Sequence, residues 1–186
     1  MSNEYPFASM RDSFDLSAYF VVGPQDCKDR PLTEVIDQAL HGGATFIQLR
    51  AKGADASELT EMARDIAQII EDNEKSDSVA FVIDDRADGV HIGQSDMEPR
   101  EARAMLGDEA IVGLSAETES LVRLINELPD GCIDYIGAGP LHVSSTKPEA
   151  SVGGNDGSGK TLDAAQINTI CSASEFPVVV GGGVTA

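Results

Sequence analysis

The chain has 186 residues, 41% of them hydrophobic, and a formal net charge of −19. This length suits one domain, and no apolar run approaches the ~20 residues of a membrane-spanning helix. So negative a chain repels phosphate backbones, which argues against binding to nucleic acid. The first residues lack the pattern of a secretory signal, and the three scattered cysteines show no metal-site spacing. We therefore expect a cytoplasmic protein whose partners are small molecules.

Apolar segments of two periodicities alternate along the chain. Short apolar runs predict strands, and segments with helical spacing between them predict helices. The predicted strands are 19–22, 46–49, 79–83, 89–92, 111–114, 133–136 and 177–180, and the predicted helices are 32–40, 57–71, 99–106, 117–128 and 162–171. Ser57 and Thr161 are predicted helix starts, and Gly42 and Gly107 predicted helix ends. This order predicts an α/β fold, and seven strands favour a (β/α)8 TIM barrel.

Two features depart from a full eightfold barrel. Only residues 84–88 separate the third and fourth predicted strands, whereas parallel neighbours ordinarily need a crossover of a dozen or more residues. The sequence also ends directly after the seventh strand. We expect that one crossover helix and the last βα unit are lacking, and we divide the chain into a lead segment, 1–18, and a barrel domain, 19–186.

Polar side chains follow most of the predicted strands, at the end where parallel barrels carry their chemistry. Four of the 13 basic residues lie there, namely Arg50, Lys52, Arg86 and Lys147. Hydroxyl groups beside Lys147 and glycine N–H groups add neutral donors for phosphate oxygens. In so acidic a chain, this placement predicts a pocket for a phosphorylated ligand. His91, by contrast, is interpreted as a packed strand residue.

Two carboxylates, Asp85 and Asp96, follow neighbouring strands without a third fixed ligand. This donor set suits Mg²⁺, which keeps several waters and bridges one or two carboxylates to substrate phosphates. Either aspartate alone could instead be a helix or turn cap. Together with the basic groups, the pair predicts a metal–diphosphate site.

Residues 154–161 match the phosphate-binding pattern G-x-x-x-x-G-K-[ST] letter for letter. That motif works when a buried strand leads directly into the loop. Here the preceding residues, 144–153, contain Pro148 and hardly an apolar side chain. We interpret the segment as a glycine-rich loop rather than a nucleotide site.

Several motifs in chain order resemble those of the thiamine phosphate synthase family. They are Gln48-Leu49-Arg50-Ala51-Lys52, Ile83-Asp84-Asp85-Arg86, His91-Ile92-Gly93-Gln94-Ser95-Asp96, Gly113-Leu114-Ser115, Tyr135-Ile136-Gly137-Ala138-Gly139-Pro140, Ser145-Thr146-Lys147-Pro148 and the segment from Pro177 to Val184. The resemblance runs from about Tyr19 to the last residue. The chain has Asp84 where the family usually has Asn, and Glu117 where it often has His.

The resemblance implies a Mg²⁺-dependent transferase that joins hydroxymethylpyrimidine diphosphate to hydroxyethylthiazole phosphate. Asp85 and Asp96 would hold the metal; Arg50, Ser115 and Lys147 would be catalytic. The implied substrate-binding residues are Gln48, Arg50, Lys52, Asp84, Ser115, Ser144, Thr146, Lys147, Gly182 and Gly183. Two other hypotheses stay open: a thiazole tautomerase-like relative, and a non-catalytic phosphate-binding barrel domain fused to another enzyme of the pathway.

Overall fold

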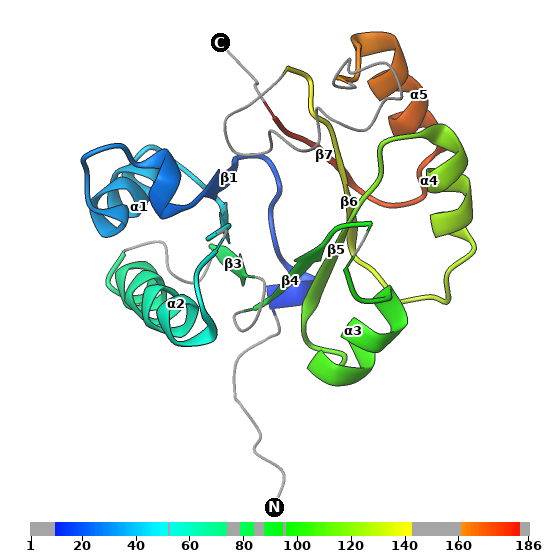
Figure 1. Ribbon diagram of the computed structural model, residues 1–186. Coiled ribbons are helices and arrows are strands. Elements are labelled where there is room, and N and C mark those ends of the chain that lie inside the picture. Colours follow the sequence, from blue (N-terminus) through cyan, green and yellow to red (C-terminus); the bar gives the residue numbers. More distant parts are fainter. Residues whose placement is uncertain are drawn as a thin grey trace, which may run out of the picture.

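Seven parallel strands curve into a nearly closed barrel in the order β1-β2-β3-β4-β5-β6-β7 (Figure 1). The computed structural model describes residues 10–51, 53–73, 79–83, 88–94, 96–142 and 161–182. The strands are β1 (Tyr19–Val22), β2 (Phe46–Leu49), β3 (Ala80–Ile83), β4 (Gly89–Ile92), β5 (Ile111–Ser115), β6 (Tyr135–Ala138) and β7 (Val178–Val180). The predicted α/β barrel class is confirmed.

Helices cover the outside of the sheet (Figure 1). They are α1 (Leu32–His41), α2 (Ala56–Glu71), α3 (Pro99–Leu106), α4 (Glu119–Asn126) and α5 (Ala164–Ala173), with short 3-10 turns η1 (Met10–Asp12) and η2 (Pro24–Asp26). One apolar cluster packs α1 and α2 on β1 to β3, and a second packs α3 to α5 on β4 to β7. Within the described residues, no helix is long and apolar enough to cross a lipid bilayer.

Aspartates, rather than the predicted Ser57 and Thr161, begin the two helices concerned. The Asp55 carboxylate accepts hydrogen bonds from the N–H groups of Ser57 and Glu58, and the Asp163 carboxylate accepts one from the Gln166 N–H at the start of α5. A carboxylate satisfies free N–H groups and also faces the positive end of the helix dipole. The predicted ends at Gly42 and Gly107 are confirmed.

The short connection between β3 and β4 joins parallel strands and not a hairpin. Val82 is level with Gly89, so β4 begins beside the end of β3. Two hydrogen bonds of 2.8 Å tie Asp88 to Phe81, one between backbone groups and one from the Phe81 N–H to the Asp88 carboxylate. Burial raises the pKa of this carboxyl group, and the bond from Phe81 opposes the rise. A Cβ at Gly89 would lie 1.9 Å from the Ile111 carbonyl oxygen, which makes glycine necessary there.

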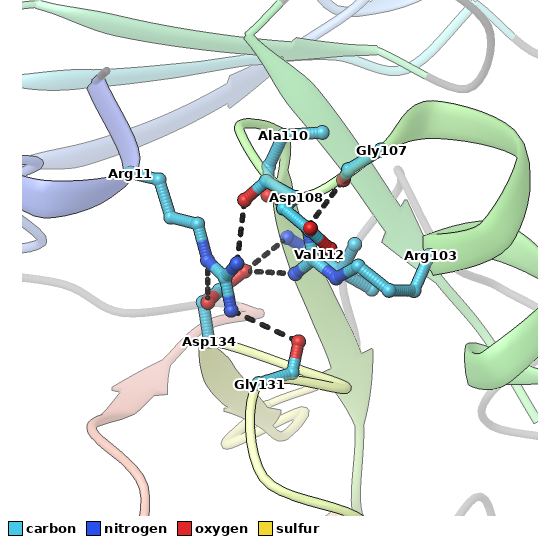
Figure 2. A network of polar contacts seen from close by, with 8 residues as sticks. All are labelled: Arg11, Arg103, Gly107, Asp108, Ala110, Val112, Gly131 and Asp134. Atoms are coloured by element: carbon cyan, nitrogen blue, oxygen red, sulfur yellow. Dashed lines mark hydrogen bonds and ion pairs between the residues drawn. The ribbon is translucent and has the colours of Figure 1, made fainter. Parts of the chain in front are cut away.

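A carboxylate held by two arginines lies just before the amino-terminal end of β6 (Figure 2). Asp134, just before β6, accepts 2.7 Å hydrogen bonds from Arg11 Nε, from Arg103 and from the Val112 N–H. Arg11 also donates to the Gly131 carbonyl oxygen. These contacts fasten the segment that precedes β1 to β5, β6 and α3.

All three cysteines are free thiols. Cys27 and Cys132 are buried as small apolar side chains, whereas Cys171 is exposed on α5.

We predict that Asp134→Ala lowers the free energy of unfolding by about 3 kcal/mol, because it leaves two mostly buried arginines without their carboxylate. Chemical denaturation followed by circular dichroism measures the change. Asp108→Ala is the matched control, since Arg11 contacts only the backbone carbonyl of Asp108. An equal loss in both variants would contradict the assignment.

Candidate functional site: a polar cavity at the carboxyl ends of the strands

A cavity opens at the carboxyl ends of β1, β2, β5, β6 and β7. Four residues predicted from the sequence line it, namely Gln48, Arg50, Ser115 and Gly182. His91, Tyr19 and Glu117 also line it, although the sequence analysis placed none of them in the site. The cavity thus combines an amide, a hydroxyl, an imidazole, a guanidinium and a carboxylate above an apolar wall that includes Val21 and Val179.

The pleat of β2 aims Gln48 and Arg50 toward the cavity. Alternate side chains point to one face of a strand, and Phe46, two residues before Gln48, lies in the apolar cluster inside the barrel. The Arg50 backbone is held on both sides, because its N–H donates to the Val22 carbonyl and its carbonyl accepts from Gln25 Nε2, each at 2.9 Å. The backbone of Arg50 is therefore held in place, and its cationic side chain lines the cavity.

Ser115 is the last residue of β5 and is buried. Its Oγ lies 3.1 Å from His91 Nε2, and its carbonyl accepts a hydrogen bond from Gln94. His91 is therefore more than a packed strand residue, because its ring contacts the predicted substrate-binding hydroxyl.

Two tyrosines continue the polar contacts into the barrel. His91 Nδ1 lies 3.0 Å from the Tyr135 hydroxyl, which lies 2.8 Å from that of Tyr19. The Tyr19 hydroxyl donates to Gln48 Oε1 at 2.7 Å. Five side chains from β1, β2, β4, β5 and β6 thus form one continuous row of hydrogen bonds.

Glycines on the neighbouring strands make room for these rings. A Cβ at Gly113 would lie 2.2 Å from the Tyr135 ring, and a Cβ at Gly137 would lie 2.8 Å from the His91 ring. Neither distance is compatible with a side chain. The Gly-x-Ser spacing on β5 and the Tyr-x-Gly spacing on β6 are the sequence signals that could have indicated two inward rings.

Gly182, at the rim, has a φ of +83°, a backbone conformation that favours glycine. A Cβ there would also lie 2.5 Å from that of Pro140. Its carbonyl accepts from the N–H groups of Leu141 and His142, each at 3.0 Å. The chain after β6 is thus held against the chain after β7.

Asp96 is exposed and does not line the cavity. Its Oδ2 accepts a 2.6 Å hydrogen bond from the Gly93 N–H, so it caps its own turn after β4. Among the described residues, no group of three or more His, Cys, Asp or Glu is arranged to hold a metal ion. One or two carboxylates suffice for Mg²⁺ when phosphate and water complete its shell, so an exposed Asp96 fits that donor set.

The remaining predicted site residues lie outside the described ranges. They are Lys52, Asp84, Asp85, Arg86, Ser144, Thr146, Lys147 and Gly183. Most of the glycine-rich segment 154–161 also lies outside the described ranges.

Fold and cavity together define the class of the protein. It is a (β/α)-barrel with a polar pocket at the carboxyl ends of its strands, the position where barrels of this kind bind and transform small molecules.

Comparison with known proteins agrees with this class. The profile of the family described as "Thiamine monophosphate synthase" matches residues 18–186. The chain therefore belongs to the thiamine monophosphate synthase family.

Individual relatives carry related names. The chain is 36% identical to "Thiamine-phosphate synthase" of Corynebacterium jeikeium over 95% of its own length and 80% of that protein. It is 37% identical to a "Probable thiamine biosynthetic bifunctional enzyme, chloroplastic" of Oryza sativa, covering 84% of this chain and 27% of that protein. The structure resembles that of "Thiamine phosphate pyrophosphorylase" from Pyrococcus furiosus, with a TM-score of 0.70 and 26% identity over 95% of this chain and 78% of that one. The barrel thus also occurs within longer bifunctional proteins.

Burial and the neighbouring Tyr19 raise the pKa of Tyr135 well above its ordinary value. The folded protein therefore keeps this phenolic proton at pH values where the unfolded chain loses it. Below pH ~10, the pKa of tyrosine in the unfolded chain, this group leaves the free energy of unfolding unchanged. Above that pH, it lowers the free energy of unfolding by up to about 1.4 kcal/mol per pH unit.

We predict that Tyr135→Phe removes this part of the alkaline loss of stability. Urea unfolding midpoints at pH 8 and above pH 10 measure it. Equal alkaline losses in the variant and in the unsubstituted protein would show that Tyr135 ionises normally.

Proposed function

We propose that this chain is a cytoplasmic thiamine phosphate synthase that joins hydroxymethylpyrimidine diphosphate to hydroxyethylthiazole phosphate. Family membership and a strand-end cavity lined by Gln48, Arg50, Ser115 and Gly182 support the proposal. Three free thiols suit a reducing compartment.

The reaction exchanges one bond for another. The C–O bond between the pyrimidine methylene and the diphosphate breaks, and its electron pair leaves with the diphosphate. The thiazole nitrogen then supplies the electron pair of a new C–N bond to the methylene carbon. Because the aminopyrimidine itself stabilises the intermediate cation, no nucleophilic side chain is needed. The demands on the protein are charge neutralisation at the leaving oxygens and alignment of the two rings.

The described residues can meet these demands. Arg50 places a guanidinium at the mouth of the cavity, where negative charge accumulates on the departing diphosphate. The Ser115 hydroxyl supplies a neutral donor, and Gln48 offers an amide to the pyrimidine. In sequence, Lys52 follows β2 and Lys147 follows β6, and both would add cations for the phosphates. Further contacts would come from Asp84, Ser144, Thr146 and Gly183.

Asp85 and Asp96 would hold Mg²⁺. The metal, when bound, neutralises charge on the diphosphate oxygens. The hydrogen bond from Gly93 fixes one oxygen of Asp96, which orients the carboxylate before any ion binds.

We predict that mixing both substrates releases diphosphate only when Mg²⁺ is present, and that Asp85→Asn and Asp96→Asn each lower turnover at least ~100-fold. Asparagine keeps an oxygen that can accept from Gly93, so the fold should persist. A coupled diphosphate assay and circular dichroism measure both effects. Lys160→Ala is the control, and a large loss there would support the nucleotide-loop hypothesis instead. Unchanged activity in both aspartate variants would remove the metal assignment.

We predict that Arg50→Ala lowers kcat/KM by about 100-fold, because it removes a positive charge that lines the cavity and would face the leaving group. Steady-state kinetics measure the change. Arg64→Ala, on the exposed side of α2, is the matched control. Similar losses in the two variants would indicate a general charge effect.

A further inference from the structure

The row of hydrogen bonds inside the barrel joins two predicted substrate contacts that lie on different strands. It runs from Gln48 through Tyr19, Tyr135 and His91 to Ser115, with separations of 2.7, 2.8, 3.0 and 3.1 Å. Gln48, Tyr135 and Ser115 are buried, so an unmatched donor or acceptor among them is costly.

For a given orientation of the Gln48 amide, counting protons fixes the direction of every bond in the row. Each tyrosine has one hydroxyl proton, and a neutral imidazole has one N–H. Since Tyr19 donates to Gln48 Oε1, Tyr135 must donate to Tyr19, and His91 Nδ1–H must donate to Tyr135. His91 Nε2 is then an acceptor, and Ser115 Oγ–H donates its hydrogen bond to it. In this direction the Ser115 hydroxyl has no proton left for a phosphate oxygen.

A half-turn of the Gln48 amide reverses the row. Nε2 then donates to Tyr19, Tyr19 to Tyr135, and Tyr135 to His91 Nδ1. His91 also changes tautomer: it loses its Nδ1 proton and gains one at Nε2, and water in the cavity that His91 lines takes up and supplies these protons, so the ring stays neutral. His91 Nε2–H then donates to Ser115 Oγ, and the Ser115 hydroxyl is free to donate a hydrogen bond to an acceptor in the cavity. Because the amide oxygen and nitrogen are nearly equal in size, both orientations fit the same space.

We propose that Tyr19, Tyr135 and His91 are positioning residues that couple the ligand at Gln48 to the donor capacity of Ser115. A ligand N–H group, such as the amino group of an aminopyrimidine, takes Gln48 Oε1 and turns Nε2 toward Tyr19. Ser115 then donates to the diphosphate. This proposal rests on the proposed function and adds a specificity to it: the amino group and the diphosphate of one substrate are sensed together.

The surroundings of the row support this role. The raised pKa of Tyr135 keeps its proton in place, so the tyrosine passes on a hydrogen-bond direction without ionising. Gly113 and Gly137 leave the two rings in the positions where the bonds form. A purely structural ring pair would not require both ends of the row to open on the same cavity.

The test measures binding of the two halves of the substrate separately. Isothermal titration calorimetry with inorganic diphosphate and Mg²⁺ is performed with and without saturating 4-amino-5-hydroxymethyl-2-methylpyrimidine. We expect the aminopyrimidine to tighten diphosphate binding about 10-fold, and diphosphate to tighten pyrimidine binding by the same factor. The same pyrimidine with hydrogen in place of the amino group should have no such effect.

Tyr135→Phe keeps the ring but cuts the row, so it should abolish the tightening while both probes still bind. Tyr19→Phe cuts it elsewhere and gives the same expectation if the first variant is unstable. Absence of coupling in the unsubstituted protein, or coupling that survives both variants, would overturn the proposal.

Turnover in the diphosphate-release assay distinguishes failure of the coupling proposal from failure of the proposed function. Release of diphosphate without coupling between the two probes rejects the proposed role of Tyr19, Tyr135 and His91 and keeps the proposed function. No turnover and no binding of either probe reject both.

Discussion

Successive side chains of a β-strand point to opposite faces of the sheet, and this alternation decides which residues of the short parallel strands line the cavity. On β2 the inward positions carry Phe46 and Gln48, and Arg50 follows at the rim. On β5 and β6 they carry Gly113, Ser115, Tyr135 and Gly137. A shift of one residue in any strand would exchange the polar row for apolar side chains that now face the helices.

The interior is polar only because its polar groups satisfy one another. A buried hydroxyl or amide without a partner costs free energy, and each member of the row between Gln48 and Ser115 removes that cost for the next. The aromatic edges of Tyr19, Phe46 and Tyr135 enclose the row, with ring centroids between 4.6 and 5.9 Å apart. This packing leaves the Gln48 amide and the Ser115 hydroxyl at the cavity surface.

The sequence predicted the barrel well because its strands are short apolar runs with polar residues directly after them. Gln48, Arg50 and Ser115 were found by that rule alone. His91, Tyr19 and Tyr135 were missed because their partners lie on other strands, 44 and 116 positions apart for the two contacts of Tyr135, and no local pattern reports such pairs. The helix starts at Asp55 and Asp163 were assigned to the hydroxyl residues Ser57 and Thr161, two positions away, because both residue types suit the position.

The close approach of rings to glycines has a consequence for how this barrel can change over time. The His91 imidazole occupies the space that a side chain at Gly137 would need, and the Tyr135 phenol occupies the space that a side chain at Gly113 would need. Neither member of such a pair can be exchanged for a larger or smaller residue without leaving a clash or a void. Related sequences should therefore alter both members together or keep both, a correlation that divergence on the outer helices would not show.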